Sequence, residues 1–127
     1  MNALAGYVAR TASEPFVWGR TDCATWAAGA VQHVAGIDPM WDMRGLYWSR
    51  FTAHRALMPF GGLASLVRAR MRRFDPIDGD GVALVRDGQS WACAIVLDGR
   101  VLLKADRGLR AADMSAELEG WTLCPKP

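Results

Sequence analysis

One cysteine, Cys23, stands at a position where a helix can turn a thiol into a nucleophile. It follows an aromatic segment, residues 15–18, and a polar Gly-Arg-Thr-Asp turn, residues 19–22. Thr21 or Asp22 can cap a new helix, because a short side-chain oxygen accepts a free N–H of the first turn. Cys23 then lies at or within one residue of the helix start, where unpaired N–H groups favour the thiolate. The alternative is that Cys23 only fills the core, and the polar, capped turn in front of it argues against this.

A thiolate that attacks an amide also needs a group that moves protons, and histidine normally does this. The chain has two histidines. His33 follows Cys23 by ten residues on the same expected helix, roughly 15 Å along its axis and beyond hydrogen-bond reach. His54 lies on a later helix, which the sequence does not place relative to Cys23. His54 is therefore the candidate base, with a surface or structural histidine as the alternative.

The helices and strands that must hold these residues are predicted from the spacing of apolar residues and from the glycines and prolines that interrupt it. Helices are expected over residues 2–11, 22–35, 49–58 and 63–71, with strands over 82–85, 91–97, 101–104 and 121–123. Asp98-Gly99 between two apolar runs is a strong hairpin signal. Helices first and an antiparallel sheet after them indicate an α+β fold, with residues 1–127 forming a single domain.

Two further groups of residues are candidates for binding. The loop over residues 40–48 carries Trp41, Tyr47 and Trp48. The helix over residues 63–71 presents arginines on its outer side, at positions 68, 70, 72 and 73, which form either a solvated face or a patch for an acidic partner. Trp18 and Trp26 are expected to pack around a groove next to Cys23.

Composition removes several classes of protein. The 127 residues carry a formal net charge of only +2, which argues against a nucleic-acid binder. The N-terminus lacks the pattern of a signal peptide, and no stretch is apolar enough to span a membrane, so we expect a soluble protein without its own export signal. Three cysteines without a CxxC pair make a disulfide framework or a zinc site unlikely. No metal and no cofactor is expected.

The order of motifs resembles the NlpC/P60 superfamily of papain-like cysteine peptidases. In that family Y-x-W-G leads to D-C at a helix start, and here residues 16–19 lead to Asp22-Cys23. Its second block, G-D-V and a strand, is similar to residues 79–85. Its third block, H-V-G-I-Y-L followed by a turn and a strand, is similar to residues 93–101. This alignment puts Ala92 at the position of the catalytic histidine and the orienting residue near Lys104, with Asp106 close by.

The chain is most similar to the short branch of this superfamily found in phage tail modules and in gene transfer agents. The resemblance implies a papain-like fold in which a nucleophile motif remains without its histidine. A structural component of the phage tail tip or hub is the first hypothesis, made in the bacterial cytoplasm and located in the virion tail, with other tail or hub proteins as partners. The alternative is an active peptidoglycan endopeptidase with Cys23 as nucleophile, Asp22 beside it and His54 as base. A nucleic-acid-binding module built on the arginines at 68–73 is a third, weaker possibility.

Overall fold

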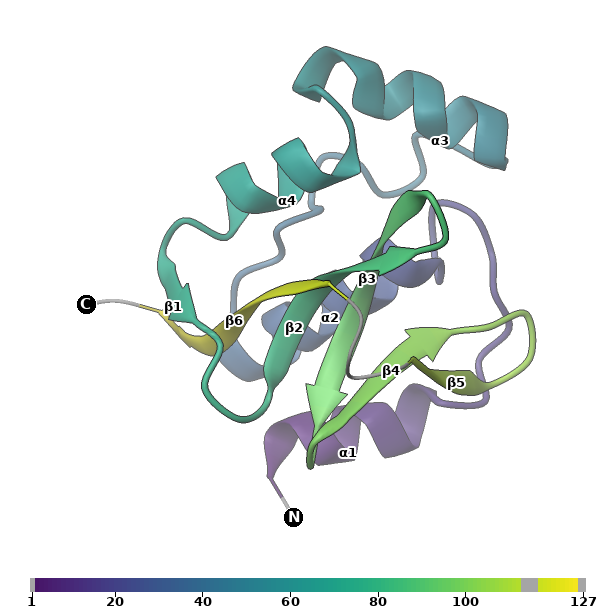
Figure 1. Ribbon diagram of the computed structural model, residues 1–127. Helices are drawn as coiled ribbons and strands as arrows, with labels where there is room; N and C mark the ends of the chain where they lie inside the picture. Colours follow the sequence, from purple (N-terminus) through teal and green to yellow (C-terminus); the bar gives the residue numbers. More distant parts are fainter. Residues whose placement is uncertain (1, 113–116, 126–127) are drawn as a thin grey trace.

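The described part of the protein is an α+β structure with four α-helices and one six-stranded antiparallel sheet (Figure 1). A computed structural model describes residues 2–112 and 117–125. The helical elements are α1 (Ala3–Thr11), α2 (Cys23–Ala35), α3 (Arg50–Leu57), the 3-10 turn η1 (Met58–Phe60) and α4 (Leu63–Arg70). The strands are β1 (Phe74–Pro76), β2 (Gly81–Asp87), β3 (Ser90–Leu97), β4 (Arg100–Lys104), β5 (Leu109–Ala112) and β6 (Leu118–Pro125).

The helices α1, α2 and α3 begin where short polar side chains satisfy free N–H groups, whereas α4 begins after Gly62 without a side-chain cap. Asn2 Oδ1 accepts from the N–H of Ala5 at 2.7 Å, and Ser49 forms a capping box with Thr52. Gly36 ends α2 in the left-handed conformation, with φ 77°. All four helices predicted from the sequence are confirmed within one or two residues at each end.

The strands follow the order β1-β6-β2-β3-β4-β5. Hairpins join β2 to β3 and β3 to β4, and the second one turns at Asp98 and Gly99, which both have positive φ. The four predicted strands are present. Two short edge strands, β1 and β5, were not predicted.

The sheet has two differently packed faces because side chains alternate along each strand. Cys93 and Ile95 of β3 join the main core with α1 and α2. Ala92, Ala94 and Val96 of the same strand belong to a second cluster on the opposite face. The main core therefore lies between α2 and the sheet, and only residues of one parity on β3 can face the start of α2.

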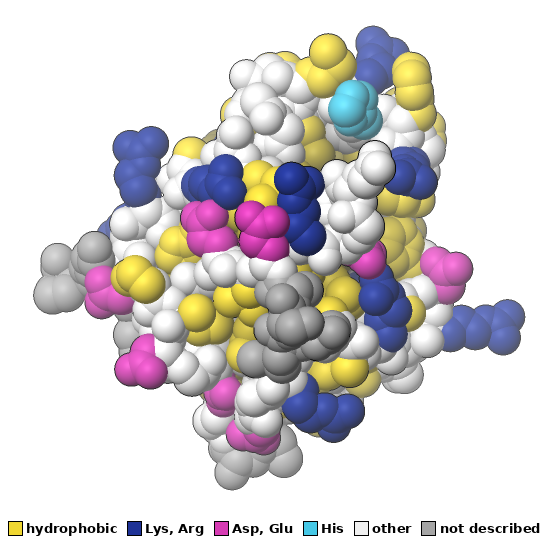
Figure 2. Space-filling view, viewed as in Figure 1, with side chains coloured by type: hydrophobic (Ala, Val, Ile, Leu, Met, Phe, Trp, Pro, Cys, Tyr) yellow, Lys and Arg dark blue, Asp and Glu magenta, His cyan; other side chains and the backbone are white. Residues whose placement is uncertain are grey.

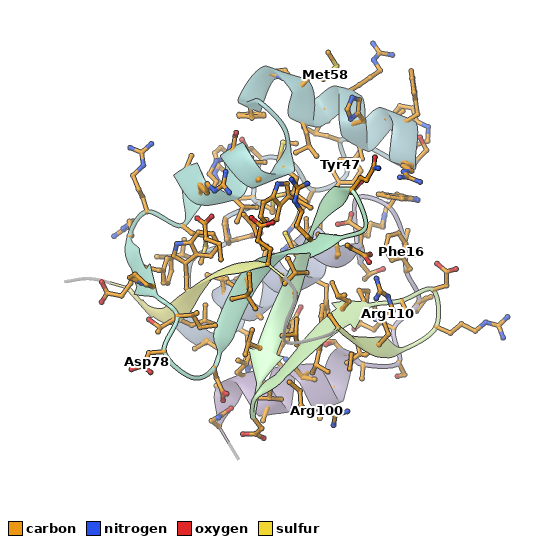
Figure 3. The ribbon with its side chains drawn as sticks, viewed as in Figure 1. Phe16, Tyr47, Met58, Asp78, Arg100 and Arg110 are labelled. Carbon is orange, nitrogen blue, oxygen red and sulfur yellow. The ribbon has the colours of Figure 1, made fainter. Side chains whose placement is uncertain are left out.

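The third helix, α3, stands at one end of the molecule, away from the sheet (Figure 1). It packs mainly on η1, and Ala53 is its only buried residue. Met58, just after α3, and Arg100, at the β3–β4 turn, lie at opposite ends of the molecule (Figure 3). In the described part of the chain, none of the helices has the length and hydrophobicity that a bilayer crossing requires.

Candidate functional site

Cys23 is the first residue of α2, as the sequence predicted. The turn before it is shaped by Gly19, which has φ 82° and lies against the carbonyl of Tyr47, where a side chain would collide. The N–H of Gly45 also donates to the carbonyl of Gly19 at 3.0 Å. The loop over residues 40–48 is thus held directly against the turn that presents Cys23.

Asp22 is the polar centre of this turn, with only 2 % of its surface exposed. Its carboxylate accepts from the N–H groups of Ala24 and Thr25 at 3.0 Å and from the N–H of Gly19 at 2.7 Å. The Tyr47 hydroxyl donates to it as well, at 2.8 Å. Asp22 therefore acts as the helix cap that was predicted, and its fourth partner ties the aromatic loop to α2.

The residue of β3 that faces Cys23 is Cys93. Cys93 is buried in the main core, and Cys23 is partly buried against the same core. Ala92, which the alignment places at the histidine position, packs on the other face of the sheet. Cys93 is thus the cysteine on the face of β3 that packs against α2.

The two thiols are shifted in opposite directions. The hydrogen bond from the Cys93 side chain lowers the pKa of Cys23, and hydrogen bonds from the backbone of Cys93 and Ala24 act in the same direction. Burial and the Asp22 carboxylate oppose this shift. The hydrogen bond to Cys23, together with burial, raises the pKa of Cys93 well above its usual value. Of the two thiols, Cys23 is therefore the one that loses its proton more readily.

Neither histidine is among the groups that act on the Cys23 thiol in the described structure. His54 is exposed on α3. His33 is exposed near the end of α2, where its Nδ1 lies 3.5 Å from Arg10 and its ring stacks near Tyr7. The assignment of His54 as a base gains no geometric support.

Lys104 and Asp106 do not form an orienting pair for a base. Lys104 is buried, and its Nζ donates to the backbone carbonyl of Thr11 at 3.2 Å and lies 5.9 Å from the ring centre of Trp26. Asp106 is exposed. Lys104 therefore holds α1 against the sheet and does not orient a catalytic base.

The predicted aromatic binding residues divide into buried and exposed sets. Trp26 is 2 % exposed, with its Nε1 donating to Thr11 Oγ1, and Tyr47 is 4 % exposed, so both are part of the interior. Trp18 is half-buried and packs edge-on against Phe16 and Tyr47. Trp41 and Trp48 are each 73 % exposed. Only these last two are free to contact a partner.

The arginines of α4 are largely committed to internal contacts. Arg68 pairs with Glu119 at 2.9 Å and lies over the ring of Trp91. Arg70 forms a two-pronged ion pair with Asp42, which lowers the pKa of that carboxyl. Arg72 and Arg73, beyond the end of α4, are exposed. The predicted arginine patch is therefore smaller than the sequence suggested.

A groove of about 510 Å³ runs between α1 and the outer side of α2. Its lining includes the charged side chains of Arg10, Arg20, Arg44 and Glu14 together with His33, and Cys23 is not part of it. Arg44 is already paired with Asp38 at 2.6 Å. Among the described residues, no group of three or more His, Cys, Asp or Glu side chains is arranged to hold a metal ion.

A family described as a domain of unknown function, DUF6950, matches residues 1–123. The chain belongs to the DUF6950 family. No curated protein and no solved structure matches it at a significant level. The match covers both elements of the thiol site, the start of α2 and strand β3. The DUF6950 domain thus includes the Cys23–Cys93 pair, but its description assigns no chemistry to it.

Proposed function

We propose that this protein is a non-hydrolytic docking component with an NlpC/P60-type, papain-like fold, located at the tip or hub of a phage-like tail. The observation that carries the loss of hydrolysis is that the buried residue of β3 on the face packed against α2 is a cysteine, Cys93, while both histidines are exposed on helices. Cleavage of an amide by a thiolate needs an acid that protonates the leaving amine, and imidazole does so near neutral pH. A buried thiol with a strongly raised pKa is a poor substitute for imidazole.

An exposed apolar surface supports the docking role. We define the docking face as the exposed large hydrophobic residues of the 40–48 loop, α3 and η1. They are Trp41, Leu46, Trp48, Phe51, Met58 and Phe60. Four of the six are aromatic, and Arg55 lies over the ring of Phe51 and Arg70 over that of Phe60. Figure 2 shows hydrophobic and basic side chains next to one another at the end of the molecule where α3 lies. Large exposed apolar patches mark interaction sites, and tryptophan and arginine are common energetic anchors of interfaces.

The location in a tail rests on the sequence resemblance alone. The residues that carry it are the block before Cys23, the stretch 79–85 and the stretch 93–101. In this proposal the α2–sheet unit serves as a scaffold, and the docking face contacts other tail or hub proteins.

An active peptidoglycan endopeptidase is the second candidate, and the lowered pKa of Cys23 favours it. The test compares wild type with Cys23→Ala on purified peptidoglycan, with release of soluble muropeptides as the readout. We expect no release above the level of the variant. Release that depends on Cys23 would show that the site is hydrolytic and overturn the loss of activity.

Docking is tested separately by incorporation into particles. Trp48→Ala removes a largely exposed ring and is not expected to disturb folding. We expect Trp48→Ala to lower the amount of protein in purified tails severalfold, because a tryptophan anchor typically contributes 2 kcal/mol or more (about thirtyfold). Arg100→Ala, at the opposite end of the molecule, is the control (Figure 3). Absence of the wild-type protein from particles would contradict the tail location.

A further inference from the structure

The groove between α1 and the outer side of α2 has the size of a ligand site. Its volume of about 510 Å³ lies within the range of pockets that bind small molecules and peptides. The buried side chains of Tyr7 and Trp26 line it, together with Gly29, which leaves the surface of α2 bare at that position. The groove shares no residue with the docking face, so a ligand bound here would not compete with docking.

Basic side chains stand at both ends of this groove. Arg20 lies just before the start of α2, whereas His33 lies in its last turn. Arg10, in the last turn of α1, lies beside His33, with a guanidinium nitrogen 3.5 Å from the Nδ1 atom. The two arginines are therefore separated by about 15 Å along α2, because an α-helix rises 1.5 Å per residue.

The arginines at the two ends are available to a ligand. Arg10 and Arg20 are exposed, and in the described part of the chain neither forms an ion pair with a carboxylate. Arg44, in contrast, is paired with Asp38 and donates to the carbonyl of Thr25 at 3.2 Å, so it is a fixed part of the wall. The groove thus offers two separated guanidinium groups, which favours a ligand with two separated acidic groups.

Two further side chains of the groove suit a peptide better than a bare polyanion. Glu14 and Gln32 are exposed, and no hydrogen bond or ion pair within the described chain engages either side chain. The carboxylate of Glu14 repels a ligand that is negative along its whole length, but it can accept hydrogen bonds from peptide N–H groups. The amide of Gln32 both donates and accepts, as a peptide backbone does. An extended peptide covers about 15 Å with roughly five residues.

We propose that this groove binds a short acidic peptide segment in an extended conformation, with an acidic side chain at each end of the segment. One acidic side chain pairs with Arg20 and the other with Arg10. The peptide backbone between them hydrogen-bonds to Gln32 and Glu14. This binding activity goes beyond the docking function and does not depend on a location in a tail.

The test titrates the full-length protein with three capped peptides by isothermal titration calorimetry at low salt. The first, acetyl-Glu-Val-Thr-Val-Glu-amide, has an acidic residue at each end and β-branched residues that favour an extended chain. The second, acetyl-Gln-Val-Thr-Val-Gln-amide, lacks both charges, and the third, acetyl-Val-Glu-Glu-Thr-Val-amide, places them next to each other. We expect the first peptide to bind about tenfold more tightly than the second and severalfold more tightly than the third, because only the first reaches both arginines.

Arg10→Ala and Arg20→Ala are each expected to weaken binding of the first peptide about tenfold. Both side chains are exposed, so neither change is expected to disturb folding. Arg73→Ala makes the same change in net charge at an exposed position outside the groove and should bind like wild type.

Four results would each overturn the proposal. They are no binding of the first peptide to wild type, equal binding of the two acidic peptides, equal losses in all three variants, and displacement of the peptide by an equal concentration of inorganic tripolyphosphate. The last two would show that the protein responds to charge alone. None of these readouts measures incorporation into tails or wall hydrolysis, so their failure leaves the proposed docking function untouched.

Discussion

At the scale of single residues, the contact between Asp22 and Tyr47 organises the site. Tyr47 is buried, and its hydroxyl is one of four donors to a carboxylate that is itself almost fully buried. Its neighbour Trp48 points into solvent. One residue of the aromatic loop therefore anchors the loop to α2, while the next one belongs to the docking face.

The burial of Tyr47 predicts a specific dependence of stability on alkaline pH. Burial, followed by the nearby Asp22 carboxylate, raises the pKa of Tyr47 far above its usual value of 10. Above pH 10 the unfolded chain loses this proton while the folded protein keeps it, so the free energy of unfolding falls as pH rises. The contribution of Tyr47 is complete below pH 10 and declines by up to about 1.4 kcal/mol per pH unit above it.

Tyr47→Phe isolates this effect from the other groups that titrate in the same range. Tyr7, whose pKa burial raises to about 12, acts in the same direction, whereas Lys104, whose pKa burial lowers, acts in the opposite one. Urea unfolding from pH 9 to pH 11.5 should show wild type more stable below pH 10, with the difference from the variant shrinking above it. A difference that stays constant with pH would contradict the assignment.

The residue of β3 that lies opposite Cys23 could not be identified from the sequence alone. The motif before Cys23 could be recognised because the cap, the turn and the thiol are adjacent in the chain. Cys93 was not singled out because the sequence does not show which residues of the strand face α2, and a shift by one position moves every side chain to the other face. Only the packing of β3 against α2 distinguishes Cys93 from Ala92.

At the scale of elements, signals that are local in the sequence predicted the helices. The two edge strands of the sheet, in contrast, depend on pairing between segments that are distant in the sequence. Asn2, Asp22 and Ser49 each cap a helix at the expected place. The edge strands β1 and β5 are short and largely exposed, so neither has the alternating pattern of a half-buried strand. They exist because β6 and β4 offer unpaired edges to them.

The helices α1 and α2 and the strand β4 meet in a buried polar network around Thr11. Thr11 Oγ1 donates to the Tyr7 carbonyl at 2.8 Å and accepts from Trp26 Nε1 at 2.8 Å. The Tyr7 hydroxyl donates to the carbonyl of Trp26, and Lys104 donates to that of Thr11. This network joins residues from both ends of the chain, which the sequence alone could not reveal.

Thr11→Val tests the network at nearly constant volume. The change removes the acceptor of Trp26 Nε1 and leaves a buried N–H without a partner, which costs about 1–3 kcal/mol of stability. Thr11→Ser keeps the hydroxyl and should lose less. Thermal and urea unfolding of the two variants provide the measurement, and equal losses for valine and serine would show that the methyl group, not the hydrogen bond, is what matters.

At the scale of the whole molecule, charge is distributed unevenly along the chain. Residues 43–74 contain seven arginines and no acidic residue, whereas the rest of the chain carries eight basic and thirteen acidic residues. Some of these arginines are neutralised by carboxylates from elsewhere, as Arg70 is by Asp42. Others, including Arg50, Arg55 and Arg72, are exposed. The docking face is therefore basic as well as apolar, and it suits an acidic partner surface.

Charge reversal within the docking face should weaken docking in a salt-dependent manner. Arg55 lies 5.9 Å from the ring centre of Phe51, and both side chains are exposed. Arg55→Glu is expected to lower the retention of the protein on isolated tails roughly fivefold at low salt, with a smaller difference at high salt, because screening shortens the reach of exposed charges. Arg100→Glu makes the same change in net charge at the other end of the molecule and should retain wild-type binding (Figure 3). Equal loss in the two variants would show that net charge matters and that the docking face does not, because only a local contact distinguishes position 55 from position 100.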